Sequence, residues 1–162
     1  MIKPLKTPAD IDLLVPLGRR IWQQHYTPII GSEQVTYMLE KFQSASAVAA
    51  QLREGYLYFG QFVEDKLVGY FAVQPREGKL FLSKFYLLDD FRGKGMGKSM
   101  MTFIEALARE KGLTAISLTV NKFNAGSIAA YDKMGFENMG PTVAEIGKGY
   151  IMDDFIMEKV LS

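Results

Sequence analysis

Arg92-Gly93-Lys94-Gly95-Met96-Gly97-Lys98 places three alternate glycines and three cations between an apparent strand and an apparent helix. Glycine carries no Cβ that would keep an anion from the backbone, and the N–H groups and positive dipole end of the following helix attract an anion. Ser99 continues this junction into the helix. The stretch therefore predicts a cradle for a ligand that carries a pyrophosphate.

The spacing of these glycines discriminates among three kinds of phosphate loop. A P-loop, Gly-x-x-x-x-Gly-Lys-Ser/Thr, would need its first glycine where Arg92 stands. A dinucleotide fingerprint, Gly-x-Gly-x-x-Gly, fails because its last glycine would fall on Lys98 or on Met100. The spacing that remains is Arg-x-x-Gly-x-Gly, and the alternative to a ligand loop is a solvated basic turn.

Arg-x-x-Gly-x-Gly, after the extended run 84–91, resembles the acetyl-CoA loop of the GNAT superfamily of N-acyltransferases. A second signature lies downstream, where the superfamily spaces an asparagine, a tyrosine and a Gly-Phe pair: Asn124, Ser127, Tyr131 and Gly135-Phe136. The two signatures cover roughly residues 80–137. The sequence departs from the pattern at Ala130, where an aromatic residue is frequent, and at Asp89, where a proline often follows the strand.

The resemblance implies direct attack of a substrate amine on the acetyl group of acetyl-CoA, the cosubstrate. It assigns Tyr131 as the general acid that protonates the departing thiolate; the alternative is a tyrosine that only packs beside Ile128. The remaining assignments are to cosubstrate binding: the strand end Tyr86, Leu87 and Leu88, the loop Arg92, Gly93, Lys94, Gly95, Met96, Gly97, Lys98 and Ser99, and the downstream residues Asn124, Ser127 and Lys133. Asn124 also suits a helix N-cap. The strand end is expected to splay from residues 119–122 at Leu88 and Asp89.

Composition excludes several other classes of protein. The 162 residues are 48% hydrophobic and 23% charged, which is typical of one globular domain spanning 1–162. A net charge of +1 argues against nucleic-acid binding. The absence of cysteine excludes a thiol nucleophile, and one histidine makes a metal site improbable. No run approaches the length of a membrane span, so we expect no membrane association and a cytoplasmic protein.

Hydrophobic periodicity predicts an α/β chain with a mixed sheet, in the order β-α-α-(α)-β-β-β-α-β-α-β that the GNAT fold implies. Runs 56–63, 67–74 and 79–88 predict an antiparallel meander. Apolar residues from Met96 to Ala108 recur at helical spacing. A strand at 116–120, a short helix from Asn124 to Met134 and a last strand at 149–161 complete the order.

The sequence does not single out one acceptor or one general base. The base candidates are His25, the carboxylates of Asp153 and Asp154 in the otherwise apolar last strand, and a chain of water molecules. A loose similarity to bacterial spermidine and spermine acetyltransferases implies a small amine, with Trp22, Tyr26, Tyr37, Asp153 and Asp154 as its contacts. The alternatives are a peptide N-terminus as acceptor and an acetyl-CoA-sensing module without turnover. The sequence is compatible with a homodimer.

Overall fold

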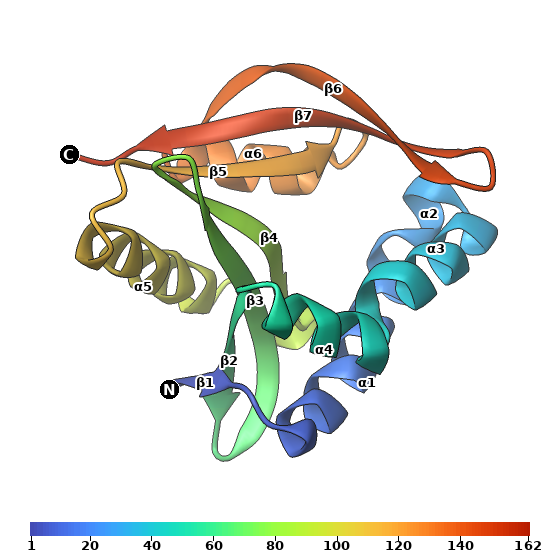
Figure 1. Cartoon of the computed structure of the whole chain (residues 1–162), viewed down its shortest axis with the longest axis horizontal. Coiled ribbons are helices and arrows are strands. Elements are labelled where there is room, and N and C mark those ends of the chain that lie inside the picture. The colour runs from blue at the N-terminus through green and yellow to red at the C-terminus, as the bar shows by residue number, and fades with distance from the viewer. The chain divides into compact units, whose positions relative to one another are not determined.

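A computed structural model describes all residues, 1–162, and they form two compact units. Unit 1 comprises Met1–Gln74 and Lys84–Met100, and unit 2 comprises Pro75–Ser83 and Met101–Ser162. The strands are hydrogen-bonded in the order β1-β2-β3-β4-β5-β7-β6, a mixed seven-stranded sheet (Figure 1). The α/β class is confirmed, whereas the single domain stays a prediction.

Unit 1 begins with a strand and a run of helices. β1 (Ile2–Leu5) leads into α1 (Pro8–His25), whose N-terminus is fixed by a capping box between Thr7 and Asp10. Further helical segments follow in chain order: α2 (Thr27–Ile30), α3 (Ser32–Met38), a π-helix (Leu39–Gln43) and α4 (Ala45–Arg53). The Ser44 hydroxyl accepts a hydrogen bond from the Ala47 N–H and thereby caps α4.

Three strands follow these helices, and residues Pro75–Ser83, at the end of the second and the start of the third, belong to unit 2. β2 (Leu57–Val63) pairs antiparallel with both β1 and β3 (Lys66–Arg76), as the predicted meander requires. β4 (Lys79–Leu87) is the next strand in the sheet. Burial alternates along it up to Tyr86: Leu80, Leu82, Lys84 and Tyr86 are buried, whereas Lys79, Phe81, Ser83 and Phe85 are half-buried. The inward face of β4 thus carries one lysine among apolar and aromatic side chains.

The predicted phosphate loop lies between β4 and α5 (Met96–Glu110). A short 3-10 helix, Asp89–Phe91, follows the strand. Gly93 and Gly95 have φ of +75° and +82°, a left-handed conformation that disfavours any residue with a Cβ. α5 then begins, and Met100, Ile104 and Ala108 are fully buried at the helical spacing that the sequence predicted.

Unit 2 contains the C-terminal strands and α6. β5 (Ala115–Asn121) is followed by α6 (Ala125–Lys133), β6 (Glu137–Gly147) and β7 (Tyr150–Val160). β7 lies between β5 and β6 and pairs antiparallel with both, and Figure 1 shows β6 and β7 as two long adjacent ribbons. The predicted element order lacked β6, so the chain ends in two strands instead of one.

The parallel pairing of β4 with β5 is short. It joins Lys79–Phe81 to Ala115–Ser117 and ends there, although both strands continue. The splay expected at Leu88 and Asp89 lies beyond this paired stretch and stays a prediction.

Candidate active site

The glycine loop of unit 1 is open on the side where a side chain would lie. A Cβ built on Gly93, Gly95 or Gly97 would meet no heavy atom within 4 Å. Packing therefore does not explain the three glycines, whereas a ligand against the backbone does. Gly97 is the sharpest case, because it lies in α5 without a left-handed φ. The residues present thus fit the pyrophosphate of acetyl-CoA.

The three cations of this loop differ in their contacts and exposure. Arg92 Nε lies 3.3 Å from an Asp89 carboxylate oxygen and donates to the Leu87 carbonyl at 3.4 Å. Arg92 is thus held against the strand end. Lys94 and Lys98 are exposed, and Lys94 Nζ lies 5.5 Å from the centre of the Phe91 ring. Met96 is half-buried and Ser99 exposed at the start of α5.

The strand end at residues 86–88 is buried and closely packed. The Leu88 N–H donates to the Val68 carbonyl at 2.9 Å. A Cβ on Gly69 would lie 2.5 Å from the Tyr86 carbonyl oxygen, so β3 approaches this backbone more closely than any other residue would allow. The position of the strand end thus depends on Gly69.

An aromatic cluster covers the strand end within unit 1. Trp22 lies 4.3 Å from Tyr26 and 6.3 Å from Tyr86, measured between ring centroids, and Tyr86 lies 5.3 Å from Tyr70. Trp22 is only 6% exposed, and its indole N–H is buried. Tyr37 is half-buried with Lys41 Nζ 5.7 Å from its ring centre. The predicted acceptor contacts Trp22 and Tyr26 therefore lie in one cluster with Tyr86. His25, the histidine weighed as a base, stacks edge-on against Tyr26.

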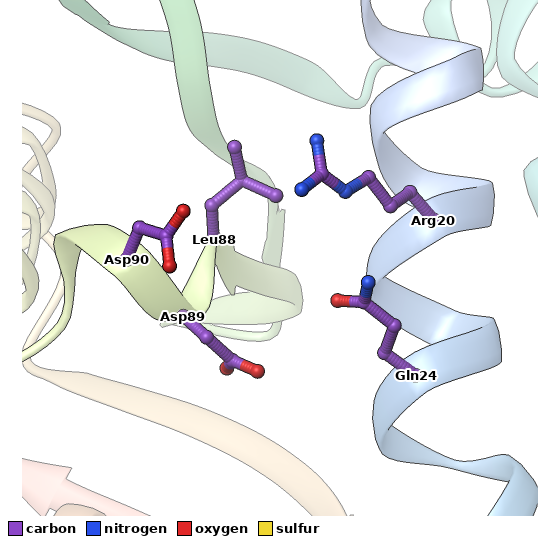
Figure 2. A pocket seen from close by; sticks show the side chains of 5 residues that line it. All are labelled: Arg20, Gln24, Leu88, Asp89 and Asp90. Carbon is purple, nitrogen blue, oxygen red and sulfur yellow. The ribbon is translucent and has the colours of Figure 1, made fainter.

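A cavity of about 330 Å³ lies in unit 1 between α1 and the turn after β4. Figure 2 shows Arg20 and Gln24 projecting from α1 toward Leu88, Asp89 and Asp90. Asp89 is paired with Arg92, whereas Asp90 and Arg20 form no ion pair. The cavity thus presents one unpaired carboxylate and one unpaired guanidinium. Of its lining, Leu88 was predicted as a cosubstrate contact, while Arg20, Gln24 and Asp90 were missed.

The second signature lies in unit 2. Asn124 is buried and caps α6, since its side-chain oxygen accepts from the Ser127 N–H at 3.3 Å. Tyr131 is half-buried, with its ring 5.5 Å from that of Phe136. Lys133 is exposed at the end of α6. α6 therefore leaves part of the Tyr131 side chain exposed.

Asp153 and Asp154 project to opposite faces of β7, as strand alternation predicts. Asp153 forms an ion pair with Lys122. Asp154 is only 5% exposed and hydrogen-bonds Thr119; burial, together with the neighbouring Asp153 carboxylate, raises the pKa of Asp154 to about 6. This carboxylate changes charge close to neutral pH, which suits a general base.

Lys84, a buried polar group in unit 1, was not among the predicted site residues. Lys84 is 4% exposed and contacts Tyr58, Gln51 and the backbone of Phe42. The signal was available, because Lys84 occupies an inward position of a strand whose other inward residues are apolar or aromatic. A lysine at such a position is rarely accidental.

Comparison with known proteins agrees with this architecture. The structure superposes on the crystal structure of PaiA N-acetyltransferase from Thermoplasma acidophilum in complex with coenzyme A with a TM-score of 0.81, at 24% sequence identity and over 99% of each chain. That likeness shows the fold. A family model, Acetyltransferase (GNAT) family, matches residues 19–136. The chain therefore belongs to the GNAT acetyltransferase family and is an acetyl-CoA-dependent N-acetyltransferase.

Two curated relatives are similar to this chain, one over nearly its whole length and one over about two thirds of it. Spermidine N(1)-acetyltransferase of Thermoplasma acidophilum is 26% identical over 155 residues, covering 93% of this chain and 91% of the relative. Spermine/spermidine N(1)-acetyltransferase of Bacillus subtilis is 25% identical over 122 residues, covering 68% of this chain and 78% of the relative. No helix of the protein is long and apolar enough to cross a membrane.

Proposed function

We propose that this N-acetyltransferase acetylates a primary amine of a small polyamine-like molecule. The observation that carries the proposal is the cavity beside the strand end, in which Asp90 offers a carboxylate without an ion-pair partner. A volume of about 330 Å³ suits a small ligand. The two relatives named as spermidine or spermine acetyltransferases support the same acceptor class.

The proposed chemistry needs an uncharged amine, a stabilised oxyanion and a proton for the leaving thiolate. The amine nitrogen attacks the thioester carbonyl of acetyl-CoA, and the carbon–sulfur bond breaks as the amide forms. Tyr131 is the proposed donor, because an ordinary tyrosine keeps its proton at neutral pH and transfers it to a developing thiolate. Asp154 is the proposed acceptor of the proton that the amine releases.

The proposed cosubstrate contacts keep the assignments of the family signatures. The backbone at residues 92–99 and the first turn of α5 would hold the pyrophosphate, with Arg92, Lys94 and Lys98 supplying positive charge. Residues 86–88, Asn124 and Ser127 would contact the pantetheine arm, and Lys133 the adenosine phosphate. Trp22, Tyr26 and Tyr37 stay proposed contacts of the acceptor.

A second candidate acceptor is a peptide N-terminus, and Arg20 is the observation that favours it. The guanidinium shares the cavity with Asp90, so an acceptor with an amine beside a carbonyl oxygen would pair with both groups. A polyamine carries no such oxygen. A polyamine would therefore depend on the negative charge of Asp90, whereas a peptide N-terminus would also depend on the positive charge of Arg20.

Competition between spermidine and a Met- or Ser-initiated peptide, at equal concentration, tests the proposal. We expect spermidine to be preferred, and Asp90→Asn to raise its Michaelis constant roughly tenfold, the scale of losing a charged hydrogen bond. Asp12→Asn, an exposed carboxylate elsewhere on α1, is the matched control. Preference for the peptide, together with a larger loss on Arg20→Gln than on Asp90→Asn, would establish the second candidate instead.

A further inference from the structure

Lys84 is the buried titratable group that the proposed mechanism does not use. Its Nζ donates to the Phe42 carbonyl at 2.8 Å, to Gln51 Oε1 at 3.0 Å and to the Tyr58 hydroxyl at 2.5 Å. These three acceptors match the three N–H bonds of a lysine ammonium. They come from the π-helix, α4 and β2, so one side chain on β4 joins three other elements.

No negative charge compensates this amine. Lys84 forms no ion pair with a carboxylate, and the titratable groups facing it from the packed strands are the phenols of Tyr58, Tyr70 and Tyr86. Burial raises the pKa of each phenol, so all three stay uncharged. The charged residues of the π-helix and α4 are exposed: Glu40, Lys41 and Arg53. Burial lowers the pKa of Lys84 to about 7.

The segment held by Lys84 also positions the strand end. Gln51 Nε2 donates to the same Phe42 carbonyl at 3.1 Å, so the π-helix is tied to both α4 and β4. The next residue, Gln43, accepts from the Tyr70 hydroxyl and donates to the Tyr86 hydroxyl, both at 3.3 Å. A π-helical turn is an uncommon conformation that frequently marks functional sites. Displacing this turn would remove the hydrogen bond that Gln43 donates to the Tyr86 hydroxyl.

We propose that Lys84 is a positioning residue that makes closure of the helical segment 39–53 over β4 depend on pH, with the uncharged amine as the working form. When the segment lifts, Lys84 reaches water and regains the proton affinity of an ordinary lysine. Protonation therefore favours the open state and deprotonation the closed state, by linkage. The closed state stays hydrogen-bonded without the proton, because the Tyr58 hydroxyl can rotate and donate to Nζ.

The size of the effect follows from the two proton affinities. With a pKa of about 7 when closed and the ordinary 10.5 when open, the opening equilibrium falls roughly 50-fold between pH 7 and pH 9. Below pH 6 it becomes independent of pH, because both states are then protonated. A lysine with an ordinary pKa in the closed state would give no change over this range.

Amide hydrogen exchange of residues 39–53, corrected for intrinsic rates between pH 6 and pH 9, tests the proposal. We expect protection in the wild type to increase above pH 7. Lys84→Met, which carries no charge, should be protected at every pH, and Gln51→Glu, which gives Lys84 a carboxylate partner, should flatten the dependence as well. Lys111→Met, an exposed lysine after α5, is the control and should behave as the wild type.

Acetylation kinetics provide a second test, which assumes the proposed function, with spermidine as the acceptor. The ratio of kcat/KM for spermidine, wild type over Lys84→Met, should rise at least threefold from pH 6 to pH 8, while CoA affinity stays equal in both proteins. Exchange that is independent of pH in the wild type, or that depends on pH equally in Lys84→Met, would refute the proposal. A constant kcat/KM ratio would refute the positioning role. If spermidine is not acetylated at all, the proposed acceptor fails, and the exchange experiment still decides the role of Lys84.

Discussion

Gly97→Ala tests whether the glycine loop binds CoA or is only a structural turn. Only a loop that binds CoA should lose CoA affinity when a Cβ is added at this position. Gly97 lies in the first turn of α5, where an added Cβ meets nothing within 4 Å and the backbone has no left-handed φ. Alanine in a helix is favoured over glycine by about 0.5–1 kcal/mol. The unliganded variant should therefore be more stable, with a melting temperature higher by roughly 1–4 °C for a chain of this size.

CoA binding should respond in the opposite direction. The same methyl group would occupy the space in which the backbone N–H groups meet the pyrophosphate, so we expect CoA affinity to fall at least tenfold, or about 1.4 kcal/mol. Thermal unfolding with and without CoA measures both quantities, since wild type at 100 times its dissociation constant gains about 2.7 kcal/mol. Thr36→Ala, an exposed helical position on α3, should gain stability without losing CoA. Unchanged CoA affinity in Gly97→Ala would show that the loop does not hold the cosubstrate.

Four further predictions concern catalysis, packing and pH. Tyr131→Phe should keep CoA affinity and lower kcat by roughly 10²–10⁴, and a loss of less than threefold would remove Tyr131 from the mechanism. Gly69→Ala should cost about 1–3 kcal/mol in urea unfolding and impair acetyl transfer, because its Cβ would lie 2.5 Å from the Tyr86 carbonyl oxygen. In the wild type, the free energy of unfolding should rise by about 1.4 kcal/mol per pH unit between about pH 7.5 and pH 10, because over this range Lys84 carries a proton in the unfolded chain and not in the folded one. Lys84→Met should lack that slope. Asp154 must lose its proton to act as a base, so kcat/KM should rise through an apparent pKa of about 6, and Asp154→Asn should abolish that rise.

Local sequence signals predicted the parts of the fold that short-range chemistry determines. The strand run 79–88, the helical repeat from Met96 to Ala108 and the alternate glycines of the loop are each encoded within a few residues. The same locality made the two family signatures readable, and the α/β class and the acetyltransferase family are confirmed. The roles of individual site residues stay predictions.

β6 was missed because its sequence lacks the usual strand pattern. Glu137–Gly147 contains Pro141 and two glycines, and most of its residues are exposed, with register shifts at both ends of its pairing with β7. An exposed edge strand needs no buried alternating face, so hydrophobic periodicity gives no signal. Only pairing with β7 reveals it.

The cavity and the Lys84 cluster depend on residues far apart in the sequence. Arg20 and Asp90 lie 70 positions apart, and neither belongs to a motif. Lys84 shows its role only when Phe42 and Gln51 are placed against β4. Long-range contacts of this kind follow from tertiary packing, which the local pattern does not specify.

Product analysis with acetyl-CoA and spermidine tests the account of function most directly. The protein is incubated with both substrates, the acetylated amine is quantified by mass spectrometry and the released CoA by its thiol. We predict one acetyl group on spermidine for each thiol released, and no product without acetyl-CoA. Thiol release without acetylated spermidine, or acetylation of the competing peptide alone, would contradict a small-amine acetyltransferase.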